Sequence, residues 1–212
     1  QGDFRAEQLR FGERTEFEMV CPYGRHTIEV QIPGRHNVPN ALAAAAAALS
    51  AGAKPADVAQ GLYEFRPPAL RMEILPLRGN RRLIRDCYNA NPQSMNAALD
   101  VLASTGGNAK TLAVLADMME LGNHMDELHA AVGKQAALLG INRLVFVGDY
   151  GSSFRNGFIS AGGDADAVTL CPDKEAAWSL INSDLSGFGA ILVKGSRVTR
   201  MELISDRIVE EN

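Results

Sequence analysis

Short apolar runs alternate with helix-periodic stretches along the last two thirds of the chain. Several runs are continuously apolar, as in 112–115, 145–147 and 191–193, which is typical of parallel strands buried on both faces. Regular alternation of strand and helix indicates an α/β layer with right-handed crossovers. We therefore predict an α/β fold with a Rossmann-like, mostly parallel sheet. The expected strands are 71–77, 82–87, 111–115, 144–147, 167–170 and 190–193, and the expected helices are 92–104, 125–139, 152–160, 174–185 and 199–210.

The first third of the chain has a different pattern. Polar and apolar residues alternate with a period of two on either side of the turn residues 22–24, which predicts a β-hairpin. An Ala-rich helix and a second short helix follow before Arg66-Pro67-Pro68 interrupts the pattern. We expect a domain boundary here, with residues 1–66 before it and residues 67–212 forming the Rossmann-like domain. The expected elements before this boundary are strands 4–11, 15–20 and 27–32 and helices 37–51 and 54–64.

Composition and charge narrow the class of protein. The 212 residues are 46% hydrophobic and 22% charged, with a net charge of −4, which argues against nucleic acid or an anionic membrane as the main partner. No apolar run approaches the roughly 20 residues that span a bilayer. The three cysteines are scattered, which indicates reduced thiols in a cytoplasmic protein. The chain begins without Met, so we expect it to be a piece of something longer.

The stretch 86–94 is the strongest local candidate for a functional site. Polar residues beginning with Asp86 follow a short strand, and Asn91 and Pro92 suit the N-cap and first positions of a helix. Ligands of open α/β sheets bind beyond the carboxyl ends of strands, and a helix N-terminus favours an anion. The alternative is an ordinary βα turn that contains cap residues. Cys87 within it is expected to be a small buried side chain rather than a nucleophile.

Other polar residues follow further strands and would share the same sheet edge if the sheet is parallel. Asp117 and Glu120 follow one strand. Lys194 and Arg197 follow the last one, with Ser196 between them, and could bind a carboxylate or phosphate. The alternative there is a solvated basic turn.

Two amide side chains and an arginine are weaker candidates for ligand binding. Asn37 and Asn40 share a helix face and could read an adenine edge, although capping by Asn37 with Asn40 exposed is the simpler interpretation. Arg71 follows the Pro-Pro segment, where the simpler interpretation is a solvated strand residue. His124 and His129 are five residues apart, which suits surface or helix-start positions better than a shared metal site.

Two common phosphate-binding patterns are missing from the 212 residues. No Gly-x-Gly-x-x-Gly follows a strand, and no Gly-x-x-x-x-Gly-Lys-Ser/Thr occurs anywhere. The sequence therefore supports neither dinucleotide binding nor a phosphate loop of the Walker type within this chain.

Five stretches in a fixed order resemble the Mur ligases of peptidoglycan synthesis. They are 34–44, Arg71-Met72-Glu73, 86–95, 117–122 and 193–197. The Tyr-Asn-Ala-Asn-Pro and Lys-Gly-Ser-Arg forms are most similar to family members that join D-alanyl-D-alanine to UDP-N-acetylmuramoyl-tripeptide. The alternatives are a non-catalytic Rossmann-like binding module, or another Mur or folylpolyglutamate-type ligase.

The resemblance implies an ATP- and Mg²⁺-dependent ligase that forms an amide bond through an acyl phosphate. By the same resemblance, residues 1–66 would close its central ATP-binding domain and residues 67–212 would form its C-terminal Rossmann-like domain. The family's phosphate loop and magnesium ligands lie upstream of Gln1, so this chain alone is expected to be inactive, with no metal ligand and no certain catalytic residue. We expect a monomer with no nucleic-acid partner and no membrane insertion. Carried over by position, ATP would contact His36, Asn37, Asn40, Arg71 and Asp86, and the other substrates would contact Asn89, Asn91, Ser94, Lys194, Ser196 and Arg197.

Some positions depart from the family pattern. Cys87 stands where Ser is usual, and Arg85 stands where a second Asp is frequent. The Arg85 change is expected to reverse the charge near the ribose.

Overall fold

The computed structural model describes residues 3–211 of the chain. They form two compact units that divide between Pro68 and Ala69. The division falls two residues after the boundary expected at 66/67, within the same Pro-Pro segment.

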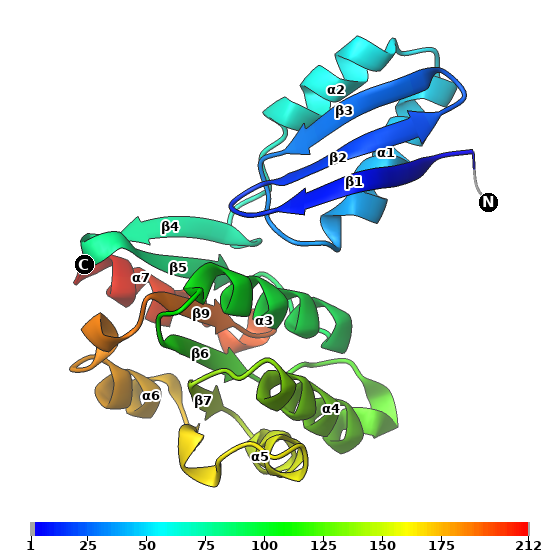
Figure 1. Ribbon diagram of the computed structural model, residues 1–212. Helices are drawn as coiled ribbons and strands as arrows, with labels where there is room; N and C mark the ends of the chain where they lie inside the picture. The colour runs from blue at the N-terminus through cyan, green and yellow to red at the C-terminus, as the bar shows by residue number, and fades with distance from the viewer. Residues whose placement is uncertain (1–2, 212) are drawn as a thin grey trace. The chain divides into compact units, whose positions relative to one another are not determined.

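The first unit is a three-stranded antiparallel sheet covered on one face by two helices (Figure 1). The predicted hairpin is confirmed. Alternation along the middle strand places Phe17 and Met19 on the helix side, where they pack with Ile28, Ala45 and Leu49. The elements are β1 (Arg5–Phe11), β2 (Thr15–Cys21), β3 (Gly24–Val30), α1 (Asn37–Ser50) and α2 (Pro55–Glu64).

The second unit contains a six-stranded sheet in the order β4-β5-β9-β6-β7-β8. Only β4 runs antiparallel to its neighbour, so the predicted mostly parallel sheet is confirmed. All six residues of β6 are buried, as its continuous apolar run predicts. The strands are β4 (Glu73–Leu77), β5 (Arg81–Asp86), β6 (Thr111–Ala116), β7 (Arg143–Val147), β8 (Val168–Cys171) and β9 (Ala190–Lys194).

Helices cover both faces of this sheet. Helices α3, α4 and α5 lie on one face, and α6 and α7 lie on the other (Figure 1). Because β5, β9, β6 and β7 are parallel, their carboxyl ends and the loops that follow meet at one edge. The helices are α3 (Pro92–Gly106), α4 (Met125–Leu138), α5 (Gly151–Ser160), α6 (Lys174–Ile181) and α7 (Glu202–Glu210).

Several predicted boundaries differ from the observed ones, and the expected strand 27–32 is observed as Gly24–Val30. The predicted strand 71–77 begins only at Glu73, because Met72 has a φ of 49° and cannot continue an extended strand. The predicted helix 199–210 begins at Glu202, because Arg200 is left-handed with a φ of 51°. The predicted helix 174–185 ends at Ile181, and a separate short 3₁₀ turn covers Leu185–Gly187.

The helices between residues 3 and 211 are all too short or too polar to cross a membrane.

Candidate functional site

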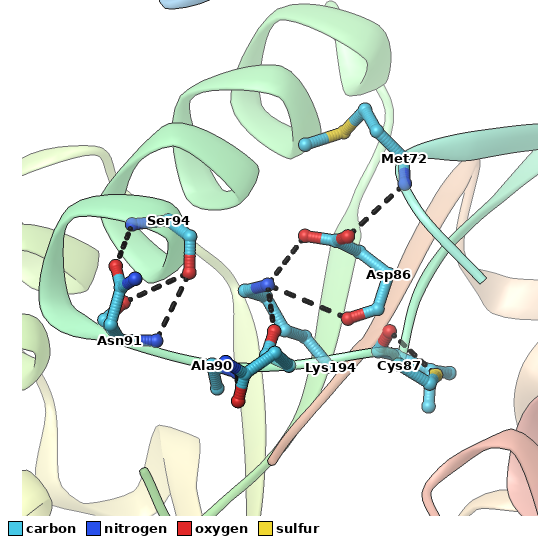
Figure 2. Close-up of polar contacts among 9 residues, drawn as sticks. Met72, Asp86, Cys87, Ala90, Asn91, Ser94 and Lys194 are labelled. Carbon is cyan, nitrogen blue, oxygen red and sulfur yellow. Dashed lines mark hydrogen bonds and ion pairs between the residues drawn. The ribbon is translucent and has the colours of Figure 1, made fainter. Parts of the chain in front are cut away.

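A buried ion pair lies at the carboxyl ends of two adjacent parallel strands. Asp86 ends β5, Lys194 ends β9, and the two residues are paired in the strand register. Lys194 Nζ donates to Asp86 Oδ2 at 2.5 Å, and the backbone N–H of Met72 donates to Asp86 Oδ1 at 3.1 Å (Figure 2). Asp86 is 8% exposed and Lys194 is 1% exposed. The carboxylate is therefore held from two sides at the edge where α/β sheets bind ligands.

Lys194 does not form the cation pair that the sequence predicted with Arg197. Its ammonium also donates to the carbonyl of Asn89 at 2.8 Å and reaches that of Asp86 at 3.5 Å. Arg197 is exposed and pairs with Glu202 at 2.9 Å instead. The two cations have separate partners because Lys194 ends a buried strand, whereas Arg197 begins the 3₁₀ turn Arg197–Thr199 outside the sheet.

The turn after β5 starts α3 as predicted. Asn91 is the N-cap and Pro92 is the first helical residue. Asn91 Oδ1 accepts from the N–H of Ser94 at 2.8 Å, and Ser94 Oγ accepts from the N–H of Asn91 at 3.1 Å (Figure 2). This reciprocal capping box engages both side chains within the helix end. Asn89 is exposed, and its Oδ1 accepts from the N–H of Ala90 at 2.8 Å.

Cys87 is completely buried beside this turn. Its Sγ donates to the carbonyl of Val193 at 3.3 Å. Burial, with a smaller contribution from the charge of Asp86, raises the pKa of the Cys87 thiol to about 12. The raised pKa disfavours the thiolate near neutral pH, and the expectation of a small buried side chain is confirmed.

The segment before β4 is attached to the same turn. The N–H of Tyr88 donates to the carbonyl of Leu70 at 3.0 Å, and the Arg71 guanidinium lies 3.9 Å from the centroid of the Tyr88 ring. Leu70 and Met72 on either side of Arg71 both have positive φ, 64° and 49°. The fold thus brings Arg71 to the Asp86 turn, in an irregular segment rather than in the predicted strand.

Ser196 joins two loops at this edge. Its N–H donates to the carbonyl of Asp117 at 3.2 Å, and its Oγ accepts from the N–H of Met119 at 2.8 Å. Ser196 is 2% exposed. The serine that the resemblance assigns to a substrate is therefore engaged with the loop after β6.

The Asp117 carboxylate occupies the turn between β7 and α5. Its two oxygens accept from the backbone N–H groups of Asp149 at 2.9 Å and Tyr150 at 3.1 Å. In a dinucleotide-binding fold, N–H groups at such a turn face a pyrophosphate. Here a side-chain carboxylate takes them, in agreement with the missing glycine fingerprint.

His129 is buried, although its sequence position predicted a surface or helix-start position. It is 0% exposed, and its ring stacks on Tyr150 with centroids 4.8 Å apart. Its Nε2 lies 2.9 Å from the N–H of Met118 and its Nδ1 lies 2.6 Å from the carbonyl of Met125. In these two bonds Nε2 accepts from Met118 and Nδ1 donates to Met125. The spacing Met125, His129, Val132, Gly133, Ala136 on one face of α4 was the available signal.

The candidate amides of the first unit lie at the start of α1. His36 occupies the N-cap position without a side-chain cap bond, and Asn37 is the first helical residue. The prediction that Asn37 caps the helix is wrong, because its Nδ2 donates to the carbonyl of Pro33 at 2.8 Å. Asn40 is exposed, as expected.

Arg85 does not share the surroundings of Asp86. Successive residues of a strand point to opposite faces, and Arg85 lies on the α7 side, 3.3 Å from Asp206 and 3.7 Å from Glu73. The Arg85 guanidinium is therefore paired with carboxylates other than that of Asp86. Among residues 3–211, no group of three or more His, Cys, Asp or Glu side chains is placed to hold a metal ion.

Comparison with known proteins supports the resemblance over the whole chain. Curated ligases named UDP-N-acetylmuramoyl-tripeptide–D-alanyl-D-alanine ligase are similar: that of Escherichia coli (strain K12) is 35% identical over 99% of this chain and 45% of its own length. That of Bacillus subtilis (strain 168) is 32% identical over 87% of this chain and 40% of its own length. The chain thus spans less than half the length of these relatives.

Solved structures show the same fold. A MurF crystal structure from Acinetobacter baumannii matches with a TM-score of 0.87 and 30% identity, over 99% of this chain and 45% of that one. Folylpolyglutamate synthase from Mycobacterium tuberculosis, complexed with ADP, matches in fold with a TM-score of 0.72 and 16% identity, over 97% of this chain and 48% of that one.

Family models match both units. The model described as the Mur ligase middle domain matches residues 1–48, and the model described as the Mur ligase, glutamate ligase domain matches residues 70–197. Because the second match alone covers more than half of the sequence, this chain belongs to the Mur ligase family.

Proposed function

We propose that this chain is part of an ATP-dependent ligase that joins D-alanyl-D-alanine to UDP-N-acetylmuramoyl-tripeptide in peptidoglycan synthesis. The observation that carries the proposal is the gathering of Arg71, the buried Asp86 carboxylate and the capped N-terminus of α3 at one sheet edge. The chain that carries this edge is similar along almost its entire length to curated ligases of that name. Residues 1–66 would then close the ATP-binding domain and 67–212 would form the last domain.

The proposed reaction has two steps. The γ-phosphoryl group of ATP passes to the terminal carboxylate of the tripeptide, which gives an acyl phosphate and ADP. The amine of the dipeptide then attacks the acyl carbon, an amide bond forms, and inorganic phosphate leaves while the amine loses a proton. Both steps bring anionic reactants together, so the site needs fixed donors and cations.

The nucleotide side is assigned to Asp86 and Arg71. A carboxylate offers about four lone-pair positions, and Met72 and Lys194 take one on each oxygen of Asp86. The remaining positions suit ribose hydroxyl groups. Arg71 is exposed on the Tyr88 ring, so its guanidinium is available to an anionic phosphate.

The start of α3 is assigned to the reaction centre. The capping box fixes the direction of the helix, whose N-terminal end carries a partial positive charge. Asn89 and Asn91 are exposed beside it. We assign these amides and Ser94 to orienting the reacting groups, with Ser94 acting through its bonds to Asn91.

The acceptor side is assigned to Arg197. Its exposed guanidinium suits the carboxylate of the dipeptide and would exchange Glu202 for it. Ser196 supports this loop through its bonds to Asp117 and Met119 rather than by contact with substrate.

The adenine assignment rests on the first unit alone. Asn40 is exposed and available, whereas the donor end of Asn37 is engaged by Pro33 and His36 lies at the N-cap position. The residues of this chain do not fit Mg²⁺, since the part of the chain that the structure describes contains no three-residue cluster of suitable ligands. We therefore propose that magnesium and the triphosphate are held by parts of the protein outside this chain, and that the chain alone is inactive.

A cytoplasmic location and a monomeric state complete the proposal. The three cysteines are free and buried, which suits a reducing compartment. Light scattering of the purified protein tests the monomeric state, and a stable dimer would contradict it.

The decisive experiment measures phosphate release and product mass for the intact protein that contains this chain. The reaction mixture holds ATP, Mg²⁺, UDP-N-acetylmuramoyl-tripeptide and one amino donor at a time. We expect turnover with D-alanyl-D-alanine and little with D-alanine or L-glutamate. Turnover with L-glutamate alone would favour a folylpolyglutamate-type ligase, and no release with any donor would favour a binding module.

A further inference from the structure

We infer that Lys194 is a positioning residue that fixes the Asp86 carboxylate and the turn after β5, and that it does not contact a substrate. The inference deepens the proposed function and rests on it for the identity of the nucleotide side. Lys194, the buried cation of the Lys-Gly-Ser-Arg stretch, would then support the turn after β5 that contains Asp86, and it would not bind the dipeptide.

The Lys194 ammonium donates to acceptors of the turn after β5. All three acceptors within reach come from the same turn: Asp86 Oδ2 at 2.5 Å, the Asn89 carbonyl at 2.8 Å and the Asp86 carbonyl at 3.5 Å (Figure 2). An ammonium group has three N–H donors. With the side chain 1% exposed, no donor is left for a ligand.

Lys194 stands at the end of an interior strand of the sheet. Strand β9 lies between β5 and β6, so its last residue is held by parallel ladders on both sides. The side chain therefore projects from a rigid strand end onto a turn that has no ladder of its own. The same strand leads directly into the loop that contains Ser196 and Arg197.

Burial makes the Lys194–Asp86 pair sensitive to the loss of either partner. A buried ammonium is tolerated only with paired and hydrogen-bonded partners, and removing one partner leaves an uncompensated charge. Asp86 is held from the opposite side by the N–H of Met72. Lys194 and Met72 together fix the direction of the carboxylate and each occupy one of its two oxygens.

Kinetics of the intact protein separate this role from a substrate clamp. For Lys194→Met we expect the KM for ATP to rise about tenfold, because the carboxylate loses a charged hydrogen-bond partner. The KM for D-alanyl-D-alanine should change less than about twofold. A raised KM for the dipeptide with an unchanged KM for ATP would overturn the inference.

Lys174→Met is the matched control. Lys174 lies at the first position of α6, also after a parallel strand, and its Nζ donates to a backbone carbonyl, that of Thr199, at 2.9 Å. The same change in side chain therefore removes a lysine hydrogen bond without touching Asp86. An equal rise in the KM for ATP in both variants would count against a specific role for Lys194.

A double-mutant cycle tests the pair without any substrate. The midpoint of thermal unfolding is measured for Lys194→Met, Asp86→Asn and the double variant. Each single change should lower the midpoint, and the double variant should regain part of the loss because no unpaired buried charge remains. If Lys194→Met does not fold, recovery of folding in the double variant supports the coupling.

Failure of this inference and failure of the proposed function would give different results. Additive losses, or a double variant that is no more stable than the worse single variant, would overturn the inference and leave the proposed function standing. An intact protein without ligase activity would overturn the proposed function, whereas coupled unfolding midpoints would still establish that Lys194 positions Asp86.

Discussion

The carboxylate of Asp117 lies directly over the Cα of Gly148. A Cβ built at Gly148 would lie 2.3 Å from Asp117 Oδ2, closer than any unstrained contact, and Gly148 has a φ of +126°. This close approach lets the carboxylate reach the N–H groups of Asp149 and Tyr150 and join the loops after β6 and β7. The loops at the sheet edge that contains the candidate site are therefore joined by the Asp117 side chain as well as by the strands they follow.

Gly148→Ala should destabilise the protein by about 2–4 kcal/mol, because the new methyl group meets the Asp117 carboxylate and the backbone conformation is unfavourable. Gly162→Ala is the control, since Gly162 also has a positive φ of +88° but no atom within 4 Å of the added Cβ. It should cost only about 1 kcal/mol for backbone conformation. Urea unfolding measures both, and equal losses would show that the Asp117 contact costs nothing.

Replacement of His129 by Phe should cost about 1–3 kcal/mol, because the buried N–H of Met118 loses its acceptor. The ring volume is nearly kept, so the loss reports the hydrogen bond more than a cavity. His124→Phe is the matched control, because the His124 side chain is 70% exposed. If the two variants unfold at the same urea concentration, the Met118 bond does not stabilise the loop.

Asn91→Ala should lower stability by about 1 kcal/mol, the usual cost of removing an N-cap side chain. Ser94→Ala should cost a similar amount, and the double variant should lose less than the sum, because the two side chains form one capping box. Gln93→Ala, at an exposed position of the same first turn, should be nearly neutral. Fully additive losses in denaturant titrations would argue that the box does not act as a unit.

The Cys87 thiol should resist alkylation in the folded protein at pH 8, because its pKa is raised from 9.0 to about 12 by burial. The unfolded thiol ionises at lower pH than the folded one, so this group weakens the folded state as pH rises from about 9 towards 12. The free energy of unfolding should therefore fall over that window more steeply in the wild type than in Cys87→Ala. Mass spectrometry after iodoacetamide treatment checks the first expectation, and rapid labelling of Cys87 without denaturant would contradict it.

The isolated 212-residue chain should bind ATP weakly or not at all. Its sequence contains no Gly-x-x-x-x-Gly-Lys-Ser/Thr loop to hold the phosphates, and only the contacts assigned to adenine, ribose and Arg71 would remain. Isothermal titration calorimetry of the chain, with the intact protein as the control, gives the comparison. A dissociation constant of about 1 µM, which corresponds to about −8 kcal/mol, for the chain alone would refute the expectation.

The sequence by itself determined the elements whose cause is local. Continuous apolar runs identified the buried parallel strands, period-two alternation identified the hairpin, and Asn91-Pro92 identified the start of α3. Each of these depends on residues that are neighbours in the chain. The ordered motifs identified the family for the same reason, since a motif can be read without knowing what it contacts.

Only the tertiary structure decided which polar residues meet. Lys194 was expected to face a ligand with Arg197, but it turns to Asp86, which is 108 positions away in the chain. His129 was expected at the surface or at a helix start, but it is buried, and its Nε2 accepts from the N–H of Met118 in the loop after β6. Residue type and spacing give a side chain its chemistry, but a buried charge or a buried ring takes its partner from whichever strand end the sheet order places beside it.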